Sequence, residues 1–213
     1  MTTNQKASLA IVAGTLCGFV TMTLHPTGHD VIQSVAGGGK GSLNVMVHSL
    51  ALLGQPLIVM GTLALTLQFR TERVLAVGAL VFFAWASAAI MIAATASGFI
   101  ATALLEQTVR EQGAARDFAA NALGYTVLLN RSFDKVYVSF SALALLLWSV
   151  AMIREKILSR SLAVYGIISG ILMLAVTLSG RLKFNIHGFG AVVLAQGIWL
   201  LWMSVTLRQA EQR

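Results

Sequence analysis

The sequence predicts an all-α membrane protein, a polytopic transmembrane bundle of six helices, and three observations lead to this class. Hydrophobic residues make up 57% of the 213 positions and charged residues only 11%, whereas a soluble domain carries about 25% charged residues. The apolar residues form long runs and not the short alternating segments that a β-barrel needs. Only two prolines occur in the chain, so we expect these runs to be helices.

Six apolar runs are long enough to cross a bilayer, which takes about 20 residues of helix. They cover residues 7–25, 43–69, 74–104, 134–153, 161–180 and 187–207. Short charged clusters separate them, and no linker divides the chain, so we expect one domain over residues 1–213. Lys6 before the first run resembles the start of a signal peptide, but no small-residue cleavage site follows. We therefore interpret this run as a retained helix.

The third run is longer than a bilayer is thick, because no charge occurs between Arg73 and Glu106. As one helix it would reach roughly 48 Å against a hydrocarbon core of about 30 Å. The helix must tilt, bend or project beyond the bilayer, and we expect a bend at residues 95–98. In the hydrophilic connection 106–133, Phe118 and Tyr125 favour a short interfacial helix between the third and fourth spans.

The distribution of Lys and Arg indicates an orientation with both termini in the cytoplasm of a bacterial-type inner membrane. Basic residues divide almost equally between the two sides, but the connections 70–73 and 154–160 are short and basic, which is typical of the cytoplasmic side. The Lys and Arg residues that give the net charge of +7 lie between the apolar runs, where they face anionic lipid. We expect membrane lipid as a partner and no nucleic acid, since no basic stripe with interleaved aromatics occurs.

Small residues predict where the helices pack closely. Gly14 and Gly18 lie four residues apart in the first run, and Gly166 and Gly170 repeat this spacing in the fifth. Close packing of small residues is a main cause of helix association in lipid. We expect these glycines to pack helices within the bundle. The alternative is that they join two chains, as a homo-oligomer or with a membrane partner subunit.

The second run is the most polar. Five residues spaced to share one helical face form its polar stripe: Asn44, His48, Gln55, Thr62 and Thr66. Polar groups without partners are costly in hydrocarbon, so the stripe should face the bundle interior or a wet cavity. Pro56 removes one backbone hydrogen bond beside Gln55 and should bend the helix there.

The four histidines are His25, His29, His48 and His187, and with six crossings they all lie near one membrane face. Imidazoles on different helices are common ligands of metal ions and haem. We therefore consider a metal or haem site whose ligands are these four histidines. The candidates for a second shell around it, or for an anion site, are Asp30, Arg131, Arg181 and Lys183. The same histidines also suit a membrane interface with no ligand, since their rings combine apolar and polar edges. The residue before a proline avoids the α region, so the first helix should stop at His25.

Further residues have simpler interpretations. Asp134 is expected to cap the fourth helix, with Arg131 beside it. The glycine-rich stretch 37–42 lacks the spacing of a phosphate-binding loop, and we interpret it as a flexible connection. Trp148, Trp199 and Trp202 are expected to form a belt at the membrane interface, while Trp85 should pack inside the bundle.

Three functions remain open from the sequence. The first is an inner-membrane protein that binds a metal ion or haem through its histidines at the outer face. The second is a small-solute carrier or channel along the polar stripe. The third is a non-catalytic scaffold or accessory subunit. No nucleophile elbow, P-loop or dinucleotide-binding motif occurs, so the sequence leaves open whether the protein is an enzyme.

Overall fold

The computed structural model describes residues 1–37, 41–182 and 186–210, and over these ranges the chain is helical with no strand. The elements in chain order are α1 (Thr3–Leu24), α2 (Gly28–Ala36), α3 (Ser42–Thr66), α4 (Arg73–Thr95), the π-helix η1 (Ala96–Ile100), α5 (Ala101–Arg110), α6 (Gly113–Glu155), α7 (Arg160–Leu178) and α8 (Ile186–Ala210).

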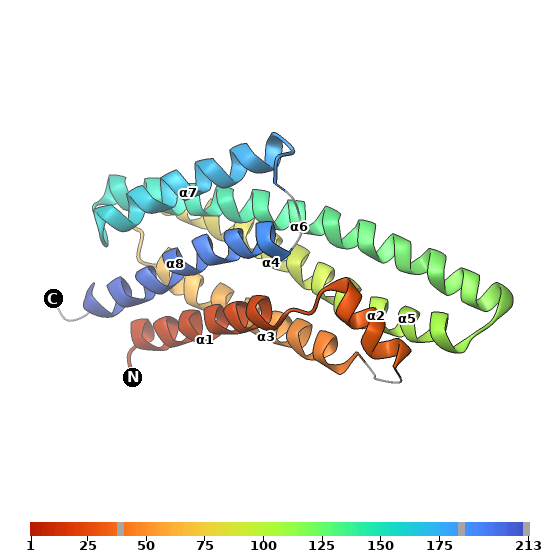
Figure 1. Ribbon diagram of the computed structural model, residues 1–213. Helices are drawn as coiled ribbons and strands as arrows, with labels where there is room; N and C mark the ends of the chain where they lie inside the picture. Colours follow the sequence, from red (N-terminus) through yellow and green to blue (C-terminus); the bar gives the residue numbers. More distant parts are fainter. Residues whose placement is uncertain (38–40, 183–185, 211–213) are drawn as a thin grey trace.

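Six helical segments in the described part of the chain are long and apolar enough to cross a membrane. They are α1, α3, the continuous segment Arg73–Arg110, α6, α7 and α8. This confirms the predicted six-helix bundle and makes the chain a multi-pass integral membrane protein. Both termini lie at one end of the bundle (Figure 1). We call this end the terminal end, and the opposite end, where α1 stops and α3 begins, the distal end.

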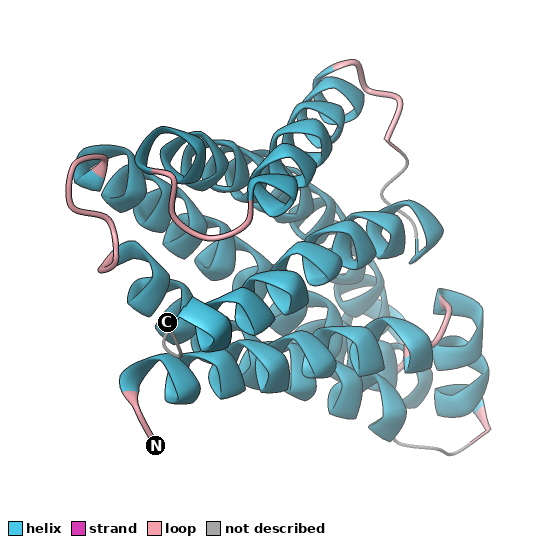
Figure 2. Ribbon diagram, turned by 90° about the vertical axis from the view of Figure 1, so that its left-hand side faces the viewer, coloured by secondary structure: helices cyan, strands magenta, loops and turns pink. Residues whose placement is uncertain are grey.

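The helices form two groups that meet along the centre of the bundle. In one group α1 packs along both α3 and α8, and in the other α6 packs along both α4 and α7. The contact between α3 and α4 joins the two groups. Figure 2 shows the bundle from the terminal end, with its helices running away from the viewer.

Large apolar side chains fill the terminal half of the bundle. Ile11, Leu65, Trp148 and Trp199 are fully buried there. The rings of Trp148 and Trp199 stack with their centroids 6.0 Å apart, so the expectation that they belong to an interfacial belt is wrong. Trp85 is the reverse case, because it is 64% exposed and faces outward. Residue counting gives the depth of a side chain in the membrane but not the direction in which it points.

The predicted bend in the third span coincides with a π-helix. Residues 96–100 form η1 between α4 and α5, and the backbone N–H of Ala101 donates to the carbonyl of Ala96, five residues earlier. A π-turn shifts the register of the helical hydrogen bonds. Carbonyl groups of this segment are therefore open to partners from another helix.

The connection 106–133 differs from the expected interfacial helix. α5 continues to Arg110, and α6 starts at Gly113, whose φ of 59° makes the turn. α6 then runs for 43 residues, which is roughly 65 Å of helix. The first half of α6 packs against α5, and the two project beyond the distal end as a helical hairpin (Figure 1). Packing against α5 explains why this segment forms a hairpin and not a separate surface helix.

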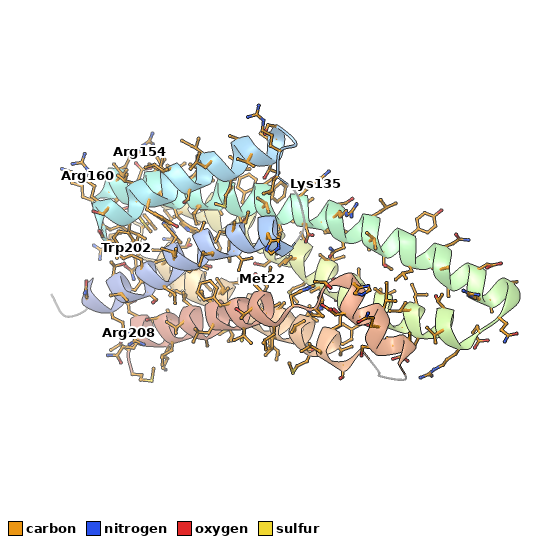
Figure 3. The ribbon with its side chains drawn as sticks, in the orientation of Figure 1. Met22, Lys135, Arg154, Arg160, Trp202 and Arg208 are labelled. Carbon is orange, nitrogen blue, oxygen red and sulfur yellow. The ribbon has the colours of Figure 1, made fainter. Side chains whose placement is uncertain are left out.

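Basic side chains gather at the terminal end, where Arg154, Arg160 and Arg208 lie (Figure 3). Polar contacts fasten the helix ends together here. Arg208 Nε donates to Ser8 Oγ at 2.8 Å, and the Glu155 carboxylate accepts from the backbone N–H of Arg70 at 2.7 Å. The terminal end is thus closed by polar contacts outside and by the packed core inside.

Candidate functional site

A cavity of about 230 Å³ lies in the distal half of the bundle. Five helical elements around it contribute polar side chains: Thr15 from α1, Gln55 from α3, Ser97 from η1, Asp134 from α6 and Gln196 from α8. The cavity therefore lies where the two helix groups meet. Apolar side chains from α3, α4 and α8 complete its wall.

The cavity reaches from the distal end to the middle of the bundle. His25 and His48 line it close to the distal ends of α1 and α3, whereas Gly14 and Ile58 line it near the middles of these helices. Met22, another lining residue, lies far from the arginines of the terminal end (Figure 3). Trp148 and Trp199 do not line the cavity, which therefore stops short of the packed core of the terminal half.

Two of the four histidines meet in this cavity. The rings of His25 and His48 lie edge to face, with centroids 4.9 Å apart. α1 ends at Leu24 and His25 is extended, which confirms the effect expected of Pro26. His48 Nδ1 lies 2.7 Å from the carbonyl of Asn44, and its Nε2 lies 2.9 Å from Ser97 Oγ. The Nδ1–H donates to this carbonyl, so Nε2 carries the lone pair of the ring and can accept from the Ser97 hydroxyl, which also lies 2.8 Å from the Ala93 carbonyl.

The other two histidines lie elsewhere. His29 is exposed on α2, where it accepts a hydrogen bond from Gln33 at 2.8 Å, and His187 is exposed at the start of α8. Neither lines the cavity. In residues 1–37, 41–182 and 186–210, no three His, Cys, Asp or Glu side chains are placed to hold a metal ion together.

The charged residues considered as a second shell do not gather at the histidines. Arg131 and Arg181 are exposed and do not line the cavity, and Lys183 lies outside the described residues. Asp30 caps α2: its Oδ2 accepts from the Thr27 N–H at 2.8 Å and from the Thr27 hydroxyl at 2.7 Å. These hydrogen bonds, that of the hydroxyl first, lower the pKa of Asp30. The spacing of Thr27 and Asp30 is that of a capping box and could have predicted α2.

The polar stripe of α3 divides into two parts. At its distal end, Asn44 Nδ2 donates to the Ser97 carbonyl and to Thr102 Oγ1, each at 2.9 Å. The π-helix thus supplies the acceptor for Asn44. Thr62 and Thr66, toward the terminal end, instead donate to carbonyls of their own helix. They lie in the packed core and do not line the cavity, so no continuous polar path follows α3.

The glycines expected to pack helices have different surroundings. A Cβ on Gly14 would lie 2.5 Å from the Gly54 carbonyl oxygen, so α1 and α3 are in backbone contact there. A Cβ on Gly166 or Gly170 would likewise meet side chains of neighbouring helices. Gly18 is different, because an added Cβ would find its nearest atom at 3.9 Å and would face the cavity.

Sequence reasoning missed the role of Asp134. The structure extends α6 well before this residue, so Asp134 does not cap a helix and is instead 7% exposed inside the bundle. Its Oδ2 accepts from Asn130 Nδ2 at 3.2 Å, and no ion pair to it is found among the described residues. Asn130, Asp134, Tyr137 and Ser141 follow one another at helical spacing, a pattern that could have predicted a polar face.

Next to Asp134, a chain of hydrogen bonds joins α6 to α8. The Tyr137 hydroxyl donates to Gln196 Oε1, and Gln196 Nε2 donates to Ser141 Oγ, both at 2.6 Å. The Ser141 hydroxyl donates to the Tyr137 carbonyl at 2.6 Å. The donors of this network are therefore already engaged.

Two acceptor atoms in the cavity wall have no partner. Thr15 is 3% exposed, and its Oγ1 makes no hydrogen bond; Gln55 Oε1 is likewise buried and unpaired. Native proteins satisfy almost all buried polar groups. Because these two oxygens line a cavity, a molecule inside it, water or a solute, can reach them as a hydrogen-bond donor.

Comparisons with protein-family models, with curated proteins and with solved structures found no match to this chain.

Proposed function

We propose that this protein is a carrier for a small solute, which enters the cavity from the distal end. The observation that carries the proposal is the cavity itself: its mainly apolar wall holds polar side chains from several helices, and two of their oxygens are buried and unpaired. Under the orientation that the basic residues favour, the distal end faces outward from the cytoplasm.

The arrangement of the helices supports a carrier over a channel. A channel needs a continuous path through the bundle. In the terminal half, Trp148 lies across such a path, and its Nε1 donates to Thr66 Oγ1 at 3.1 Å. In many carriers the substrate binds near the middle of the membrane, between two helix groups that rock against each other. Here Gln55 and Gln196 come from one group and Asp134 and Tyr137 from the other.

The two other functions suggested by the sequence have less support. A metal or haem site would use the four histidines, but of these His25 and His48 meet, and within the described residues no three His, Cys, Asp or Glu side chains are placed to hold a metal ion together. A scaffold would be expected to have a filled core, since packing is its only role. The cavity and its unpaired oxygens favour a protein that binds a solute.

Blocking the cavity tests the proposal. Gly18→Leu places a side chain at a glycine that lines the cavity and whose added Cβ would meet its nearest atom at 3.9 Å. Gly124→Leu adds the same side chain to an exposed glycine with nothing near its Cβ. The probes are n-butylammonium, 1-butanol and butyrate, added to the purified protein in detergent. We expect one of them to raise the Tm of the parent and of Gly124→Leu, because a ligand that binds the folded state stabilises it. The same probe should leave the Tm of Gly18→Leu unchanged.

Uptake of that probe into proteoliposomes should also be lost in Gly18→Leu and kept in Gly124→Leu. The proposal is wrong if no probe stabilises the parent protein, or if blocking the cavity leaves stabilisation and uptake unchanged.

A further inference from the structure

We propose that the solute is a small organic cation with N–H donors, such as a protonated primary amine, and that Asp134 binds its ammonium group. This inference rests on the carrier function proposed above. It concerns the charge and the hydrogen-bonding character of the solute, which the carrier proposal leaves open.

The first argument is charge. The Asp134 carboxyl is almost fully enclosed in the bundle, and its one hydrogen-bond donor is the neutral amide of Asn130. The basic residues next to it on α6, Arg131 and Lys135, are exposed. A carboxylate away from water needs a countercharge or a proton. Within the described ranges the ion pairs are Arg110–Glu106 and Arg154–Glu72, so a cationic solute would supply the missing countercharge.

The second argument is the direction of the hydrogen bonds. Thr15 Oγ1 and Gln55 Oε1 are unpaired and can accept beside the Asp134 carboxylate, although the Thr15 hydroxyl and Gln55 Nε2 can also donate. By contrast, the Tyr137 hydroxyl and the Gln196 amide already donate to partners within the protein. An ammonium group offers three donors and no acceptor, which matches this wall. An anion would find no lysine or arginine among the residues that line the cavity, and it would meet the Asp134 carboxylate there.

The third argument is the apolar part of the wall. Ile58, Ile90, Val193 and Leu200 line the same cavity as Asp134. A hydrated inorganic cation gains nothing from such a surface, whereas a short alkyl chain is removed from water by it. The combination of one carboxyl, free acceptors and aliphatic side chains therefore fits an alkylammonium ion.

The test measures the affinity of the full chain for n-butylammonium by calorimetric titration, with 1-butanol, butyrate and potassium chloride as competitors. We expect butylammonium to bind and each competitor to displace it weakly. Asp134→Asn should weaken binding by roughly 30-fold or more, because it removes one partner of an enclosed ion pair. Asp117→Asn removes the same charge from an exposed position of α6 and should leave the affinity unchanged.

A second variant separates charge from folding. Asp134→Glu keeps the carboxyl and should retain part of the affinity that Asp134→Asn loses, while the Tm of each variant without ligand reports whether it folds. Equal affinity of parent and Asp134→Asn would overturn the inference. So would displacement by potassium at equal concentration.

The two proposals fail in different ways. If 1-butanol or butyrate binds, with loss in Gly18→Leu but not in Asp134→Asn, the carrier proposal stands and the cation inference is wrong. If no probe binds the parent, both are wrong.

Discussion

At the scale of single residues, the direction in which a side chain points decides its role. Trp148 and Trp85 both occur in membrane-spanning helices, yet Trp148 is fully buried and donates to Thr66, whereas Trp85 faces outward. Asp134 and Asp117 differ in the same way along α6. In a membrane helix the polar group with no contact to lipid is the one that carries specific interactions.

Replacing the two tryptophans tests this difference. Trp148→Phe removes an indole N–H bond and part of a fully buried ring, so we expect it to lower the free energy of unfolding by about 1–3 kcal/mol. Trp85→Phe should change it by less than about 0.5 kcal/mol, as is usual for exposed positions. Unfolding in mixed detergent, followed by circular dichroism, measures both. Equal losses in the two variants would contradict the buried position of Trp148.

At the scale of elements, close backbone contact holds α1 against α3, and a π-helix adapts the third span to its neighbours. Gly14 and Gly54 bring the two backbones together. At η1, a Cβ on Gly98 would lie 2.4 Å from His48 Cβ, so this glycine lets the histidine pack against the π-helix. The side-chain amide of Asn44 donates a hydrogen bond to the Ser97 carbonyl of the same turn. Sequence periodicity finds such helices but does not give the register between them.

The two glycines of α1 provide a matched pair of variants. Gly14→Ala forces a methyl group against the Gly54 carbonyl, and we expect a loss of about 1–3 kcal/mol in the free energy of unfolding. Gly18→Ala meets no neighbour and should be neutral or stabilising by up to about 1 kcal/mol, because alanine favours the helix. The same unfolding assay measures both. The contact between α1 and α3 would be misplaced if Gly14→Ala were as stable as Gly18→Ala.

At the scale of the whole molecule, an even number of crossings places both termini on one side and the hairpin of α5 and α6 on the other (Figure 1). The cavity extends to His25 and His48 near the distal end, and the packed tryptophans lie between it and the terminal end. The two helix groups would have to separate around these tryptophans before a solute could leave on the terminal side.

Labelling of introduced cysteines tests this topology and its orientation. In a Cys17→Ala background, Glu111→Cys lies in the turn of the hairpin and Arg160→Cys lies at the terminal end. We expect a membrane-impermeant maleimide to label Glu111→Cys in intact spheroplasts and Arg160→Cys only after permeabilisation. Labelling of both in intact cells would contradict the six crossings, and the reverse pattern would mean that the orientation is inverted.

The sequence by itself determined that this protein resides in a membrane, the number of its spans and the residue at which α1 ends. These follow from hydrophobicity, length and local rules such as the effect of Pro26 on His25, which act within one segment. It also identified the polar stripe of α3, of which His48 and Gln55 line the cavity.

Only the tertiary structure decided which polar groups meet. It brought Asp134, Gln55, Thr15 and Gln196 to one cavity from four helices, although up to 181 positions separate them along the chain. It also turned Trp148 inward and left Gly18 without a neighbour. The physical reason is that hydropathy fixes how deep a residue lies, while the rotation and register of each helix come from close packing against its neighbours.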